Sequence, residues 1–170
     1  MIMRTLFLIL FSFLIFSSCQ HQCRYAESGP EIDNVKAAIE AYEAGDWATQ
    51  KSYYADTVKF YHNSPEGVSF DEANAALMRL LSEVAEYSFE DDMDFEFVTT
   101  DSGDHWVSWW GIWNGKLKAN GQEFRTPVHI SAKIEGGKIA EEYGYWDNQP
   151  LAAALMELSA AAAAEQESEE

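Results

Sequence analysis

The chain has 170 residues, of which 29 are acidic and 11 are Lys or Arg, and its formal net charge is -18. Nucleic acids and anionic lipid surfaces are bound through basic faces that neutralise phosphates, and so few cations provide no such face. The aromatic content of 14% supplies large side chains for a core, and the length suits one domain.

Residues 1–18 have the pattern of an export signal, with one cation near the start and an apolar run that ends at Phe16. The run is far shorter than the roughly 20 residues that a helix needs to span a bilayer. Cys19 follows two serines, as in a bacterial lipobox, so we expect it to be lipidated and residues 19–30 to form a tether. This predicts an exported lipoprotein of a bacterial cell envelope, held to the membrane only by its lipid. Phe16 stands where such boxes usually carry Leu, so ordinary cleavage to a secreted or periplasmic protein is the alternative.

Residues 31–149 are expected to form one domain, because their hydrophobic periodicity alternates between helical and extended spacing. The expected elements are a helix over 31–44, a short helix over 46–54, a strand over 58–62, a long helix over 70–87, strands over 88–100 and 105–118, and two strands on either side of Gly136-Gly137. An alanine-rich helix over 150–164 and a disordered acidic tail over 165–170 follow. This order predicts an α+β fold, in which a curved mixed β-sheet wraps around three N-terminal helices as a cone with a pocket at its wide end.

Two turns of hairpin type, Asn120-Gly121 and Gly136-Gly137, set a register for the last three strands, in which Ile130 lies opposite Tyr143. This register sorts the side chains into two faces. The inner, apolar face collects Val107, Trp109, Trp113, Leu117, Phe124, Val128, Ile130, Ile134, Ile139, Tyr143, Tyr145 and Asp147. The outer, mixed and aromatic face collects Trp106, Ser108, Trp110, Ile112, Arg125, His129, Ser131, Lys133, Glu142 and Trp146.

A second copy of the chain is the expected partner of the outer face. Exposed aromatic patches usually mark contacts. We therefore expect a homodimer through the region that contains Trp110, Ile112, His129 and Trp146.

Three stretches resemble the SnoaL-like branch of the nuclear transport factor 2-like (NTF2-like) superfamily. They are residues 37–46 (AAIEAYEAGD), 53–60 (YYADTVKF) and 137–147 (GKIAEEYGYWD). The resemblance implies the cystatin-like α+β roll of that superfamily. It implies no single activity, because isomerases, cyclases, hydrolases, dehydratases and members without catalysis share the fold.

Asp147 and His62 are the candidate catalytic residues. The register places Asp147 at the end of the inner face, where partial burial would suit it to general acid or base work. In SnoaL-like cyclases an aspartate transfers the proton, and the resemblance over 137–147 implies this role for Asp147. The alternative is that Asp147 caps the helix that begins near Pro150. His62 points inward at the end of its strand, either as a second polar group of the pocket or as a satisfied histidine at its rim.

Four aromatic residues are candidates for lining an apolar pocket, with plain core packing as the alternative: Tyr42, Trp109, Tyr143 and Tyr145. His129 lies on the opposite face from Asp147, and only a β-bulge would bring it to the pocket. The histidines are scattered and no cysteine cluster occurs, so the sequence predicts neither a metal site nor a cofactor.

Three kinds of function fit these patterns. The first is a membrane-tethered domain that binds a small hydrophobic molecule without chemistry. The second is an exported enzyme that moves a proton on, or adds water to, a small apolar substrate, with Asp147 as general acid or base. The third is a dimeric protein-interaction module whose outer face is the working surface. The volume of the cavity separates the third from the other two.

The lipobox pattern predicts that the mature protein begins at a lipidated Cys19. Mass spectrometry of the N-terminal peptide from the membrane fraction should show the added acyl mass, and Cys19→Ala should move the protein to the soluble fraction. An unmodified N-terminus at another residue, or a Cys19→Ala protein that stays in the membrane, would contradict this prediction.

Overall fold

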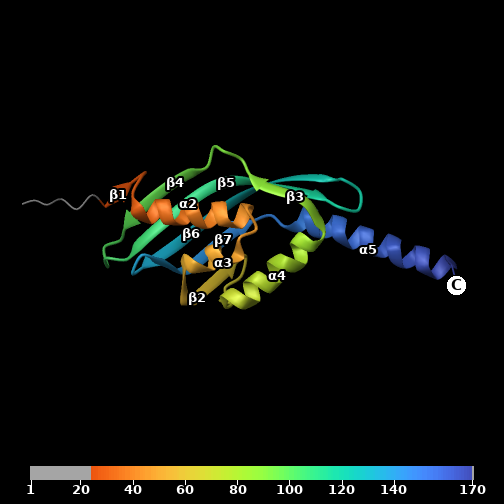
Figure 1. Cartoon of the computed structure of the whole chain (residues 1–170), viewed down its shortest axis with the longest axis horizontal. Coiled ribbons are helices and arrows are strands. Elements are labelled where there is room, and N and C mark those ends of the chain that lie inside the picture. Colours follow the sequence, from red (N-terminus) through yellow and green to blue (C-terminus); the bar gives the residue numbers. More distant parts are fainter. Residues whose placement is uncertain (1–23, 170) are drawn as a thin grey trace, which may run out of the picture.

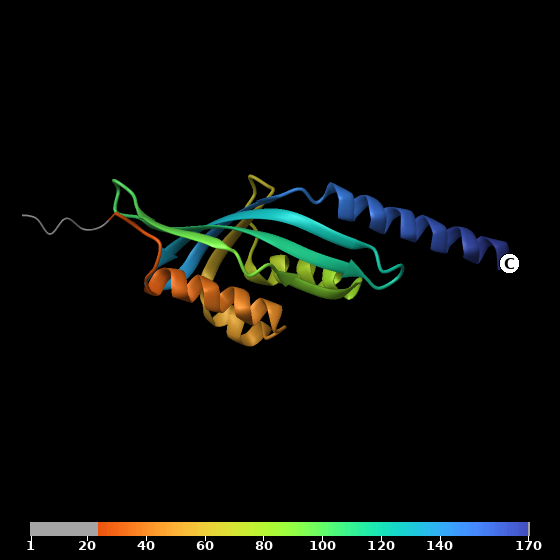
Figure 2. The same cartoon turned by 90° about the horizontal axis from the view of Figure 1, so that it is seen from above.

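The computed structural model describes residues 24–169, and Figure 1 shows a curved sheet with helices packed against it. The elements are β1 (Tyr25–Ala26), α2 (Pro30–Glu43), α3 (Trp47–Ser52), β2 (Tyr54–His62), α4 (Phe70–Ser82), β3 (Val84–Phe89), β4 (Asp94–Thr99), β5 (His105–Leu117), β6 (Glu123–Glu135), β7 (Lys138–Trp146) and α5 (Gln149–Glu169). Helices α2, α3 and α4 lie on one side of the sheet (Figure 2). Helix α5 packs against the core at its start, where Leu151 and Ala154 are buried, and then extends away from the body. The predicted signal and Cys19 lie outside the described residues.

The strands follow the order β1-β4-β5-β6-β7-β2, and β3 also pairs with β5. Strands β3 and β4 pair with the two halves of one edge of β5. Strand β2 runs parallel to β7, and the other pairs are antiparallel, so the sheet is mixed. The predicted fold class, a curved mixed sheet with three N-terminal helices, is confirmed.

The core lies between the inner face of the sheet and the helices. Helix α2 buries Ile32, Val35 and Ile39 at helical spacing. The predicted inner-face residues of β5 and β6 that are buried are Val107, Trp109, Trp113, Leu117, Val128, Ile130 and Ile134. Each large apolar side chain removed from water in this way contributes roughly 1.5–3 kcal/mol. The predicted inner face of these two strands is therefore confirmed.

The turn between β5 and β6 differs from the predicted hairpin, but the faces do not change. Phe124 lies opposite Gly115, whereas a two-residue turn would place it opposite Leu117. The pairing of the two strands is therefore shifted by two residues. Because side chains alternate with a period of two, a shift by an even number keeps each one on its own face.

Strand β7 contains a β-bulge that the predicted register lacks. Ile134 pairs with Ile139 as predicted, but Lys133 pairs with Glu141, so Ala140 is an extra residue. A single extra residue moves every later side chain of the strand to the other face.

The predicted faces are consequently wrong beyond the bulge. Glu142, predicted outside, is buried, and Trp146, also predicted outside, packs against the core. Tyr143 and Tyr145, predicted inside, lie on the outer face, where Tyr145 is 54% exposed. Ile130 lies opposite Gly144 and not opposite Tyr143.

Several boundaries also differ from the periodicity. Helix α4 begins with a capping box formed by Ser69 and Glu72, and it ends at Ser82 rather than near residue 87. Val84 fits the apolar face of a helix in the sequence, yet it lies in β3 opposite Leu117, because tertiary packing overrides local propensity.

The segments that flank the domain carry more regular structure than the sequence predicts. Residues 25–26 of the predicted tether form β1 beside β4. Helix α5 continues to Glu169 through the predicted disordered tail, because Ala, Glu and Gln extend a helix that has already begun. Among the described residues, no helix has the length and apolar character needed to cross a membrane.

Candidate functional site

A cluster of polar side chains is buried on the inner face, where β2 and β7 run side by side. Glu142 of β7 is 7% exposed. Its Oε1 atom lies 2.8 Å from Nε2 of His62, and its Oε2 atom accepts a 3.0 Å hydrogen bond from the hydroxyl of Tyr54. His62 and Tyr54 are the last and first residues of β2, so one pair of parallel strands supplies the whole cluster.

Aromatic rings surround the cluster. The His62 imidazole makes edge contacts with the rings of Phe60 and Trp146, at centroid distances of 5.2 and 5.0 Å. Phe70, the first residue of α4, contacts the ring of Tyr54 at 5.5 Å. The side chain of His62 is 30% exposed, against 9% for that of Glu142, so the imidazole is the point at which the cluster meets solvent.

The electrostatics of the cluster follow from this burial. Desolvation, together with the Glu142 carboxylate, raises the pKa of Tyr54 well above its usual value, so the phenol stays protonated and donates to Glu142. A carboxylate can only accept hydrogen bonds, which assigns the proton of a neutral His62 to Nε2 and leaves Nδ1 as an acceptor. The buried carboxylate thereby fixes the tautomer of the exposed imidazole.

Gly144 and Asn63 make the close approach of these groups possible. A Cβ atom at Gly144 would lie 2.8 Å from Cδ2 of His62 and 2.6 Å from the ring of Trp146. Asn63, which has a φ angle of 49°, donates a 2.9 Å hydrogen bond to the backbone carbonyl of Trp146 and accepts one of 3.2 Å from its N–H. Asparagine tolerates this left-handed conformation better than most residues. The turn after β2 therefore holds Trp146 beside His62.

The structure separates the two predicted catalytic residues. His62 points inward as predicted, but its polar partner is Glu142 and not Asp147. Asp147 is exposed, and its Oδ1 accepts a 3.0 Å hydrogen bond from the backbone N–H of Gln149, the first residue of α5. The inner-face position predicted for Asp147 is wrong, because the bulge at Ala140 reverses the alternation on which it rested.

The predicted pocket residues do not line a common pocket. Trp109 is 3% exposed and stacks on Phe95 in the core. Tyr42 accepts a 2.9 Å hydrogen bond from Nε1 of Trp113, and burial raises the pKa of Tyr42 above its usual value. Tyr143 and Tyr145 lie on the other side of the sheet.

The outer face carries stacked aromatic rings, which we call the outer aromatic face. One row joins Trp110, His129 and Tyr145, with centroid distances of 4.6 and 6.4 Å. Another row consists of Trp106, Tyr143 and Tyr61, with distances of 5.9 and 4.5 Å. His129 and Trp110 are on this face as predicted, and half-buried Ile112 shares their parity on β5 and β6. Trp146, which was predicted for this face, does not lie on it, because the bulge turns its side chain toward His62.

Sequence reasoning missed Glu142 and Tyr54. Simple alternation assigns Glu142 to the outer face, and the one-residue bulge moves it to the inner face. Tyr54 lies before the predicted start of its strand. The one sequence signal for a bulge was that uninterrupted alternation would bury Tyr143, Tyr145 and Asp147 and expose Trp146.

Comparisons with known proteins agree with this fold. The model of the SnoaL-like domain matches residues 35–142, which is more than half of the chain. A candidate polyketide cyclase of Xanthomonas campestris pv. campestris has 19% identity and a TM-score of 0.59, over 75% of this chain and 98% of that one. An NTF2-like protein of unknown function from Burkholderia pseudomallei K96243 has 17% identity and a TM-score of 0.58, over 73% and 95% of the chains.

The hydroxylase candidate AclR of Streptomyces galilaeus has 12% identity and a TM-score of 0.61, over 75% of this chain and 96% of AclR. At these identities the likeness shows the fold alone. No curated protein matches the chain.

Proposed function

This chain belongs to the SnoaL-like family, and we propose that it binds a small, largely apolar molecule at the exposed edge of His62. We also propose, from the sequence pattern at Cys19, that the domain is exported and anchored by a lipid. The binding proposal is carried by the hydrogen-bonded pair of His62 and Glu142 at the rim of an otherwise apolar interior. Buried ionisable groups cost folding free energy, and groups of this kind concentrate at functional sites.

We place the ligand at the rim beside His62, because the hollow that borders the cluster at Tyr54 is too small to hold it. The hollow lined by Tyr54 and Phe70 holds about 80 Å³, whereas pockets for small molecules hold roughly 300–1,000 Å³. The His62 imidazole and the neighbouring ring of Trp146 therefore supply the contact surface for the ligand.

The free Nδ1 atom of His62 determines which polar group the ligand must carry, namely a hydrogen-bond donor. Glu142 holds Nε2, and within residues 24–169 no hydrogen bond reaches Nδ1. A hydroxyl group on the ligand can donate to Nδ1 while its apolar part lies against Trp146. A ligand with an acidic proton would turn the same site into a proton-transfer site, because Glu142 would stabilise the imidazolium that forms.

Binding of 2-naphthol, an apolar ring system with one hydroxyl, tests this proposal. It should shift the NMR signals of the His62 imidazole and the Trp146 indole. His62→Ala removes both ring contact and a hydrogen bond, so it should weaken the binding of 2-naphthol about fivefold more than that of naphthalene, since one hydrogen bond is worth about 1 kcal/mol. Tyr61→Phe, on the outer side of β2, is the matched control and should change nothing. Equal affinity of wild type and His62→Ala for 2-naphthol, or no shift at His62, would refute the proposal.

A second observation favours self-association, and we propose that the rings of Tyr61, Trp106, Tyr143 and Tyr145 on the outer aromatic face join two copies of the chain, with Trp110 left uncovered at the rim of this contact. Its aromatic rings lie beside charges that are already paired, Arg125 with Glu90 at 2.6 Å and Lys133 with Asp104 at 3.1 Å. A contact between two such faces would bury aromatic area without stranding these charges.

The dimer predicts that Tyr145→Glu lowers the mass measured by sedimentation to that of one chain, because a carboxylate would be buried at the contact. Met156→Glu adds the same charge at an exposed position of α5 and should leave the dimer intact. A wild-type protein that sediments as a monomer at high concentration would show that this face does not join two copies.

A further inference from the structure

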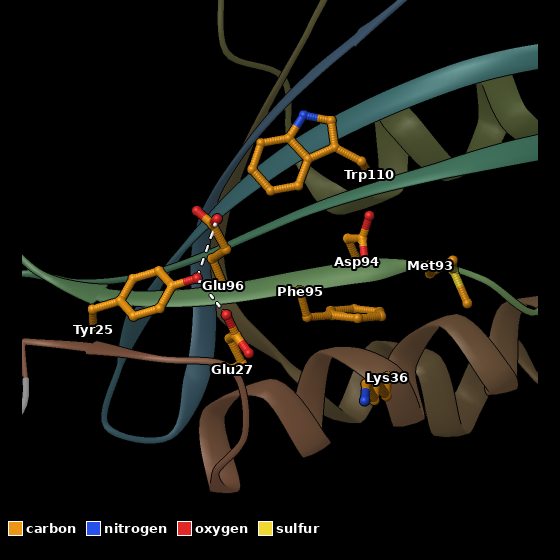
Figure 3. Close-up of a pocket in the computed structure, with 8 residues that line it drawn as sticks. All are labelled: Tyr25, Glu27, Lys36, Met93, Asp94, Phe95, Glu96 and Trp110. Atoms are coloured by element: carbon orange, nitrogen blue, oxygen red, sulfur yellow. Dashed lines mark hydrogen bonds between the residues drawn. The ribbon is translucent and has the colours of Figure 1, made fainter.

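A hollow lies outside the cone, at the edge of β4. It holds about 580 Å³ between β4, α2 and the segment before α2. Figure 3 shows its walls: Trp110 above the strand, Phe95 and Lys36 below it, and Tyr25, Glu27 and Glu96 at one end. We call this hollow the edge groove.

The edge groove presents aromatic surface. Trp110 is 42% exposed, and His129 stacks on it from β6, on the side away from β4. On the β4 side the residue paired with Trp110 is Asp94, so a carboxylate lies next to the indole. The chain already places an ammonium group on a ring of this groove, since Nζ of Lys36 lies 4.8 Å from the centroid of Phe95. Indole and phenyl faces attract cations in this way.

The carboxylates of the groove lack the cationic partner that several other carboxylates on or beside the sheet have. Glu90, Glu123 and Glu135 each form a salt bridge with a basic side chain. In the described part of the chain, no salt bridge reaches Glu27, Asp94 or Glu96.

Tyr25 does not neutralise this charge. Its hydroxyl donates to Glu27 at 2.9 Å and lies 3.3 Å from Glu96, and the hydrogen bond to Glu27, with desolvation and Glu96 adding to it, raises the pKa of Tyr25 to about 12. A phenol that keeps its proton contributes no positive charge to the groove.

The arrangement of the aromatic rings and carboxylates in the edge groove favours an organic cation over a metal ion. Between residues 24 and 169, no group of three or more His, Cys, Asp and Glu side chains is arranged to hold a metal ion. An alkylated ammonium group is larger than a metal ion, needs no inner-sphere oxygen ligands and gains from aromatic faces. We infer that the edge groove binds an organic cation with an alkylated ammonium group, seated between the indole of Trp110 and the carboxylates of Asp94 and Glu96.

Choline and its neutral isostere 3,3-dimethylbutan-1-ol test this inference, with the full chain in a neutral maltoside detergent. Calorimetry and the Trp110 indole signal should report binding of choline that is at least about tenfold tighter than that of the isostere. Trp110→Leu and Asp94→Asn should each weaken choline binding about fivefold, in line with a cation–π contact and a charge pair at a partly exposed site. Two controls on the outer aromatic face, Trp106→Leu and Glu141→Gln, should bind choline like the wild type.

Three results would overturn the inference. Equal binding of the isostere would mean that the groove is merely apolar. Equal loss in the control variants, or full competition by the same concentration of sodium chloride, would mean diffuse attraction to an acidic protein. No change of the Trp110 signal at saturating choline would place the cation elsewhere.

Discussion

The buried carboxylate of Glu142 is the constraint on which the inner face depends. A carboxylate taken out of water needs hydrogen-bond donors, and their loss leaves an uncompensated charge that costs several kcal/mol. Tyr54 and His62 supply these donors from the two ends of β2. The parallel pairing of β2 with β7 is thereby tied to the chemistry of the site.

One extra residue organises both faces of the sheet. The bulge at Ala140 turns Glu142 and Trp146 toward the helices and Tyr143 and Tyr145 away from them. Without it, the inner face would carry Tyr143, Tyr145 and Asp147 in place of Glu142 and Trp146, and the outer aromatic face would lose the partners of Tyr61 and His129. The proposed ligand site and the proposed dimer contact therefore share one structural origin.

The sequence was sufficient for the fold and for the inner face of β5 and β6, because helical spacing, turn glycines and alternating apolar residues act locally. It also placed His62 correctly, since parity within β2 holds from Val58 to His62. It could not place Asp147 or Glu142, because a bulge depends on how β7 fits its neighbours and has no reliable local signal. The edge groove was out of reach for a similar reason, as it joins β4 to a segment some seventy residues earlier in the chain.

The tautomer of His62 tests the central claim most directly. Two-dimensional ¹⁵N–¹H NMR of the neutral imidazole distinguishes a proton on Nε2 from one on Nδ1. The geometry predicts the Nε2–H form in the wild type, held by Glu142, and a reduced preference for that form in Glu142→Gln. A wild-type His62 with its proton on Nδ1, or identical spectra for the two proteins, would contradict the account.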